Sequence, residues 1–197
     1  KHLFKNKITH LKKIAMRKKN LYLTLAFMLM LSIVGCKKDT VDPNESELIT
    51  TVKVVLTEKV SGTQSIFEFK DLDGVGGAAP SKFDEIILAR GKVYDCKLQL
   101  LNESKTPVDD ITLEVTAEGV DHQIYLSASN ALAAVSNLNN DAKGLPLGIT
   151  STWTAAAAAG TGTMNVTLKH KPGVKAAGDP VSKGETDISI DFKLSVR

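Results

Sequence analysis

The chain is poor in cysteine, in aromatic residues and in long apolar segments. Its 197 residues include two cysteines, Cys36 and Cys96, and aromatic residues make up 5% of the composition, with a single Trp. Two cysteines are too few for a disulfide framework, so the fold has to rest on its apolar core. Because so few aromatic rings are present, most are needed in that core and few remain for a binding surface.

Motifs of the common enzyme classes are also missing from the sequence. It has no Gly-x-Ser-x-Gly elbow, no phosphate-binding loop, no His-Glu-x-x-His helix and no zinc-binding cysteine pair. Acidic residues that could form a hydrolytic pair are plentiful, but such a pair needs a cleft and one raised pKa. They are Asp109, Asp110, Glu114, Glu118, Asp121, Glu185 and Asp187. We expect a protein that is not an enzyme, with a hydrolase as an alternative.

The longest feature near the amino end is a fourteen-residue apolar run over residues 21–34, which follows Arg17, Lys18 and Lys19. As a helix it would extend about 21 Å, short of the roughly 30 Å of a bilayer core. A signal segment fits this length better than a permanent span, and a short uncleaved anchor is the alternative. Met16 fits a translation start, which would make residues 1–15 an upstream extension.

The end of this run resembles a bacterial lipobox, with Ile33 three residues before Cys36 and Gly35 directly before it. The resemblance implies that residues 1–35 are removed and that Cys36 becomes a lipidated first residue. Two or three acyl chains would anchor the protein firmly. Residues 36–47 are polar and are expected to form a flexible tether.

The charge of the chain depends on this leader. Residues 1–35 hold eight Lys and Arg and no acid, which leaves 17 basic and 22 acidic residues, a net charge of −5. No basic patch remains in the mature chain, which argues against nucleic acid as a partner. Lys37, Lys38 and Asp39 partly resemble an export signal of gram-negative surface lipoproteins. We expect an outer-membrane location, on the cell-surface or the periplasmic face.

Residues 48–197 are long enough for one well-buried domain. Apolar residues alternate with polar ones in several segments, and turn residues separate those segments, which is typical of antiparallel sheets. The alternating segments begin at Val52, Phe67, Tyr94, Ile111, His122, Met164 and Ile188. The pattern predicts an all-β, antiparallel sandwich of seven or eight strands with immunoglobulin-like architecture. Cys96 is in phase with Tyr94 and Leu98, which predicts a small core residue.

Short segments spread over the whole domain are similar to a group of small gram-negative outer-membrane lipoproteins of unknown function. They are ELITT at 47–51, DLDG at 71–74, GGAAP at 76–80, LLNES at 100–104, DIT at 110–112, DHQ at 121–123, GTGT at 160–163 and GETD at 184–187. Some members of that group are described as having a type 1 periplasmic binding fold, which implies alternating strands and helices. The alternation seen here has period two and favours the sandwich.

Two metal sites are conceivable from the sequence. Asp71 and Asp73 stand in a glycine-rich loop that could hold calcium. The spacing of its oxygen-bearing residues does not match an EF-hand. The alternative is a turn in which both Asp side chains cap backbone N–H groups. His122 and His170 each lie in core phase at the end of an expected strand. If those ends meet, the pair could bind a transition metal or haem iron, and otherwise they are two separate histidines satisfied by loop carbonyls.

Tyr125 and Trp153 could line a ligand-binding surface that stacks on sugars, with core or rim packing as the alternative. Taken together, these features predict a lipid-anchored, non-enzymatic binding or accessory module at the outer membrane. Its partners would be membrane lipid through Cys36 and an outer-membrane transporter or a small ligand. A metal or haem carrier that uses His122 and His170 is the second hypothesis.

Overall fold

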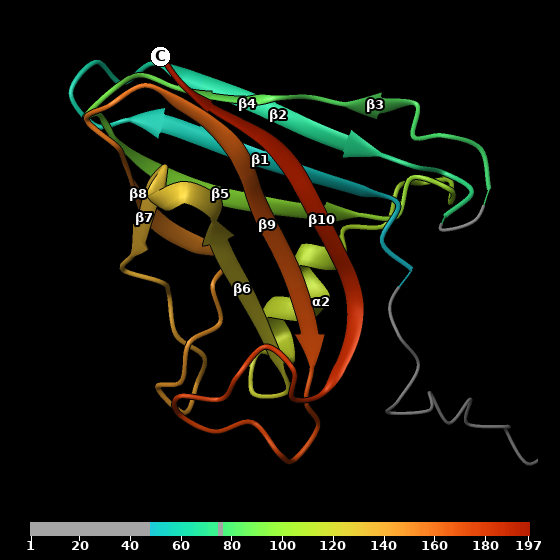
Figure 1. The fold of residues 1–197 in the computed structure, drawn as a ribbon. Helices are drawn as coiled ribbons and strands as arrows, with labels where there is room; N and C mark the ends of the chain where they lie inside the picture. Colours follow the sequence, from blue (N-terminus) through green and yellow to red (C-terminus); the bar gives the residue numbers. More distant parts are fainter. Residues whose placement is uncertain (1–47, 75–76) are drawn as a thin grey trace, which may run out of the picture. The chain divides into compact units, whose positions relative to one another are not determined.

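The computed structural model describes residues 48–74 and 77–197, which form two packed β-sheets (Figure 1). The larger sheet has the strand order β3-β2-β1-β5-β8-β7 and the smaller one β4-β10-β9-β6. The strands of the larger sheet are β1 (Thr51–Glu58), β2 (Gln64–Lys70), β3 (Lys82–Phe83), β5 (Val93–Leu101), β7 (Ala133–Ser136) and β8 (Thr150–Ala155). Those of the smaller sheet are β4 (Ile86–Leu88), β6 (His122–Ala128), β9 (Gly160–His170) and β10 (Glu185–Val196). The expected all-β sandwich is thus confirmed.

The core lies between the two sheets and is built from alternate residues of each strand, as period-two patterning requires. Its fully or nearly fully buried members include Val52, Val54, Leu56, Leu98, Leu100, Trp153, Met164, Val166, Leu168, Phe192 and Leu194. Neighbouring strands are antiparallel except for β4, which runs parallel to β10. Cys96 is buried in this core, as expected, and burial raises the pKa of its thiol to about 12.

The prediction of a strand at residues 111–117 is wrong, because this segment forms a helix, α2 (Ile111–Ala117). Asp110 caps it by accepting a hydrogen bond from the N–H of Thr112 on its side-chain oxygen (3.0 Å). Ile111 and Val115 are buried and lie one helical turn apart, whereas Leu113 is 69% exposed. In a seven-residue segment this spacing of four is easily mistaken for alternation.

The described domain has ten strands, more than the seven or eight expected from the sequence. The strands absent from the expected set are β3 with two residues, β4 with three, β7 with four and β8 with six. The 3-10 turn η2 (Ser129–Ala131) and β7 lie between β6 and β8. Figure 1 shows β9 and β10 as long, curved strands, and α2 contacts β5 of the larger sheet.

Candidate functional site

The leader, Cys36 and the tether lie outside the described residues, so their expected roles stay predictions. In the part of the chain that the structure describes, no helix is long and apolar enough to cross a bilayer. The first described residue is Leu48, which is twelve residues from Cys36. Even a fully extended chain of that length spans no more than about 40 Å.

The structure brings His122 and His170 together. They are direct cross-strand partners in β6 and β9, and their rings stack with centroids 4.7 Å apart and planes 10° from parallel. Both are buried, with exposures of 1% and 7%. Nδ1 of His122 donates to the carbonyl oxygen of Glu118 (3.1 Å), just after α2. Burial, and to a lesser extent His170, lowers the pKa of His122, while the Glu118 hydrogen bond opposes this shift.

This arrangement is not that of a formed metal site. A metal ion lies in the plane of an imidazole that binds it, so two nearly parallel stacked rings cannot direct nitrogen lone pairs at one ion. Among residues 48–74 and 77–197, no three His, Cys, Asp or Glu side chains gather as metal ligands would. A carrier that uses His122 and His170 would have to unstack the rings first.

Asp71 and Asp73 both act as acceptors within their own loop. Asp71 Oδ1 accepts a hydrogen bond from the N–H of Gly74 (3.2 Å), and Asp73 Oδ2 accepts one from that of Ala78 (2.7 Å). The latter bond is the main reason why the pKa of Asp73 is lowered. Backbone capping of this kind is the alternative to calcium binding that the sequence leaves open.

Tyr125 and Trp153 do not form a shared stacking surface. Trp153 is 0% exposed, and its indole N–H donates to Ser151 Oγ (2.9 Å), so it belongs to the core and not to a ligand surface. The Tyr125 hydroxyl donates to the carbonyl oxygen of Asp179 (2.8 Å), and Lys171 Nζ lies 4.7 Å from the centre of its ring. One face of that ring is therefore occupied by a lysine of the protein itself.

The loop between β9 and β10 is held by three lysines. Lys171 is fully buried, and its ammonium group donates to Gln123 Oε1 (3.1 Å) and to the Tyr125 hydroxyl. Lys175 makes a buried ion pair with Asp141 (2.7 Å), and Lys183 pairs with Asp179 (2.9 Å). The loop is thus tied to β6 and to the segment between β7 and β8.

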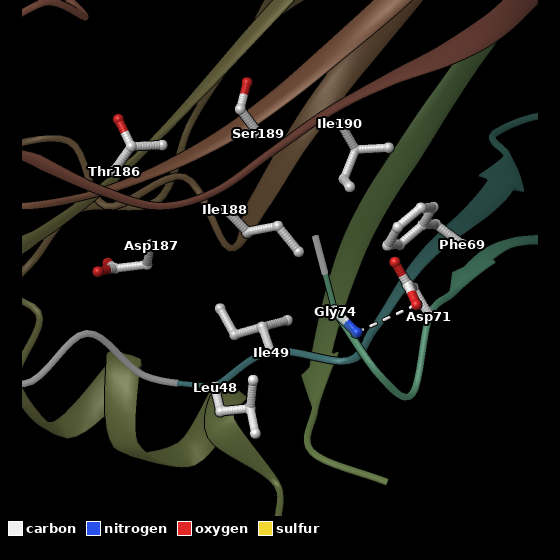
Figure 2. Close-up of a pocket in the computed structure, with 10 residues that line it drawn as sticks. All are labelled: Leu48, Ile49, Phe69, Asp71, Gly74, Thr186, Asp187, Ile188, Ser189 and Ile190. Atoms are coloured by element: carbon white, nitrogen blue, oxygen red, sulfur yellow. Dashed lines mark hydrogen bonds between the residues drawn. The ribbon is translucent and has the colours of Figure 1, made fainter. Parts of the chain in front are cut away.

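A pocket of about 430 Å³ opens between the sheets where β1 begins and β2 ends (Figure 2). Half of its lining residues are aliphatic or aromatic: Leu48, Ile49, Phe69, Ile188 and Ile190. The others are Asp71, Gly74, Thr186, Asp187 and Ser189. Pockets of this size that combine an apolar wall with polar groups are typical of small-molecule sites.

Asp187 is the most unusual of the lining residues. It stands at a register shift between Thr186 and Ile188, where β10 bulges against β9. Both of its carboxylate oxygens are buried, and no described residue donates a hydrogen bond to them. Burial raises the pKa of Asp187 to about 6; Glu185 adds to this shift, while His170 and Lys169 oppose it.

The sequence names Asp187 only as one acid among many and does not indicate the pocket. Residues 48–49, 69–74 and 186–190 come together only in the folded chain, so no local motif marks them. The one feature of the sequence that could have indicated Asp187 is its position directly before the alternating run that starts at Ile188.

Comparisons of the chain with protein-family models, with curated proteins and with solved structures found no match. The function is therefore argued from the pocket and the sequence themselves.

Proposed function

We propose that the protein is a lipid-anchored, non-enzymatic binding module of the outer membrane, and that the pocket beside Leu48 takes a small amphiphilic ligand. The observation that carries this proposal is the hollow of about 430 Å³ between the sheets, with five apolar side chains in its wall. Burying a ligand's apolar surface there would supply about 25 cal/mol per Å². The lipid on Cys36 would hold this pocket within about 40 Å of a membrane, where amphiphiles concentrate.

Hydrolysis is a less suitable function for the same pocket. Asp71 and Asp187 both line it, and the pKa of Asp187 is raised, as acid catalysis needs. However, Asp71 is engaged in capping Gly74, and the neutral polar side chains of the lining are only Thr186 and Ser189. A sugar needs more hydrogen-bonding groups than these, whereas an apolar chain does not.

The first test concerns anchoring. Replacing Cys36 with Ala should leave an unlipidated precursor, because the substitution removes the thiol that would carry the lipid. Intact-mass measurement and detergent partition of the wild type and of C36A would report the difference. Identical processing of the two proteins would contradict the lipoprotein assignment.

The second test concerns the pocket. We expect an uncharged fluorescent probe, N-phenyl-1-naphthylamine, to bind the wild type, and we expect Ile188→Trp to weaken it about tenfold or more by filling the hollow. Thr63→Trp is the matched control, since it adds the same side chain to a smaller hollow of about 220 Å³ at the other end of β1. Equal probe affinity in both variants, or none in the wild type, would rule out the pocket as the ligand site.

A further inference from the structure

One end of the larger sheet carries polar side chains on its inward face. In β2, the inward alternation that includes the partly buried Phe67 continues to Ser65 and Thr63, both of which are exposed. In β1, the inward row of buried aliphatic residues ends at Glu58. In β5, the inward row begins at Tyr94. Polar groups at core-facing positions weaken a core, so their gathering on three neighbouring strands points to a function.

These inward positions line a hollow of about 220 Å³ between β1 and β2 of the larger sheet and β4 of the smaller one. Polar side chains make up more than half of its lining: Glu58, Ser61, Thr63, Ser65, Lys92 and Tyr94. Phe67 and Ile87 contribute to an apolar wall. The hollow is smaller than a site for a drug-sized molecule, so its ligand should be small.

Glu58 gives this hollow a charged acceptor. Its side chain is 11% exposed and lines the hollow. Its two carboxylate oxygens accept hydrogen bonds from the N–H groups of Val60 (3.1 Å) and Ser61 (3.0 Å), which fix the carboxylate in place. A hydrogen bond from the Ser61 side chain outweighs burial and, with the two N–H groups, holds the pKa of Glu58 below its usual value. A carboxylate has about four acceptor positions, so capacity remains for a ligand hydroxyl.

Tyr94 gives the hollow an oriented donor. It is 9% exposed and is the cross-strand partner of Glu58. Its hydroxyl oxygen accepts a hydrogen bond from the N–H of Ala89 (2.8 Å), but its own proton has no acceptor among the described residues. A ligand oxygen in the hollow would supply that acceptor. Lys92 is a movable donor, because its Nζ lies 3.9 Å from Glu58 Oε1 and its side chain is 47% exposed.

The charges of the hollow favour a neutral ligand that both donates and accepts hydrogen bonds. Glu58 and Lys92 balance each other, so an ion of either sign would draw one of them away from the other. The neighbouring serine and threonine hydroxyls can donate or accept. A sugar ring has hydroxyl groups of the same kind at its edge, and its C–H groups can pack against Phe67 and Ile87.

We propose that this hollow binds a single sugar ring, whose hydroxyl groups Glu58 and Tyr94 recognise while Phe67 and Ile87 contact its C–H groups. The site is distinct from the pocket beside Leu48, and the inference does not depend on what that pocket binds.

The experiment titrates D-glucose, D-galactose, D-mannose and N-acetyl-D-glucosamine into the wild-type protein and follows binding by saturation-transfer-difference NMR. We expect at least one of them to bind with a Kd of about 1 mM or below. Cyclohexylmethanol is the control ligand, since it has a ring of the same size and a single hydroxyl. It should bind at least about tenfold more weakly than that sugar.

Four variants place the site. Thr63→Trp should weaken the sugar at least about tenfold by filling the hollow, whereas Ile188→Trp, in the other pocket, should leave it within about twofold. Tyr94→Phe removes the oriented proton and should weaken the sugar about threefold to tenfold. Tyr125→Phe is its matched control, since that hydroxyl donates to the carbonyl oxygen of Asp179 outside the hollow. Far-UV circular dichroism checks that each variant is folded.

The outcomes separate this inference from the proposed function. If no sugar of the panel binds the wild type at up to about 20 mM, or if Thr63→Trp and Ile188→Trp affect its binding equally, the sugar site is wrong. Unchanged binding in Tyr94→Phe would also contradict it. Each of these results leaves the apolar pocket standing, because N-phenyl-1-naphthylamine tests that pocket independently.

Discussion

Replacing Lys175 with Met should lower the free energy of unfolding by about 3–5 kcal/mol, the cost of removing one partner from a buried ion pair. The side chains of Lys175 and Asp141 are 2% and 0% exposed and lie 2.7 Å apart. Lys175 Nζ also donates to the carbonyl oxygen of Gly119 (2.7 Å). Methionine has a similar length but offers neither charge nor donor, so Asp141 would remain as an unpaired buried carboxylate.

The pKa of Asp141 shows how much this pair matters. Burial alone would raise it, but hydrogen bonds from Lys175, Leu145 and Lys143 outweigh burial and hold it below the usual value. Urea unfolding can be followed through the fluorescence of Trp153, the only Trp of the chain and a fully buried one.

Two companion variants make this test specific. Lys183→Met changes the same residue type in the same loop, but Lys183 is 37% exposed in its pair with Asp179, so a loss below about 1 kcal/mol is expected. The double variant K175M/D141N should recover much of the loss. Asp141 Oδ1 accepts from the N–H groups of Lys143 and Leu145, and the asparagine oxygen can do the same. A loss as large in K183M as in K175M would show that the ion pair has no special role.

The strands and their inward faces could be predicted from the sequence because they depend on local alternation. Ile190, Phe192, Leu194 and Val196 are buried in β10, as their spacing indicates. Helix α2 could not be separated from a strand, since seven residues hold fewer than two helical turns and its capping by Asp110 resembles an ordinary turn signal.

The site could be predicted only in part because it depends on register. The phases of His122 and His170 placed both at strand ends, but only the pairing of β6 with β9 makes them neighbours. The bulge beside Asp187 shifts that residue out of simple alternation, and the partners of Lys175 lie 34 and 56 residues away. Such long-range pairings leave no trace in local composition.

Asp187→Asn should raise the free energy of unfolding at pH 8, by less than the roughly 3 kcal/mol of the full pKa shift, because solvent screens a side chain that is only partly buried. The pKa of Asp187 is raised from 3.8 to about 6 in the folded protein, and each unit corresponds to about 1.4 kcal/mol. A raised pKa means that the folded state binds the proton more tightly than the unfolded chain. The charged form is therefore destabilising above pH 6, and wild-type stability recovers as the pH falls from 6 toward 4.

His122 acts in the opposite direction over the same pH range. Its pKa is lowered below 6.5 by burial, so the unfolded chain binds the proton more tightly and stability is lost as the pH falls below 6.5. In the wild type the two effects oppose each other, so its change in unfolding free energy between pH 7 and 5 should lie between those of variants that keep only one of the two groups.

Single substitutions should expose each effect. D187N is expected to lose stability on acidification from pH 7 to 5, because the His122 effect is then unopposed. His122→Gln should instead gain stability over that interval, because only the Asp187 effect remains, even though the lost ring stack makes it less stable throughout. Urea unfolding at half-unit pH steps would measure both slopes. Parallel curves of unfolding free energy against pH for the wild type and the two variants would contradict this prediction. They would mean that neither His122 nor Asp187 has a different pKa in the folded and the unfolded protein.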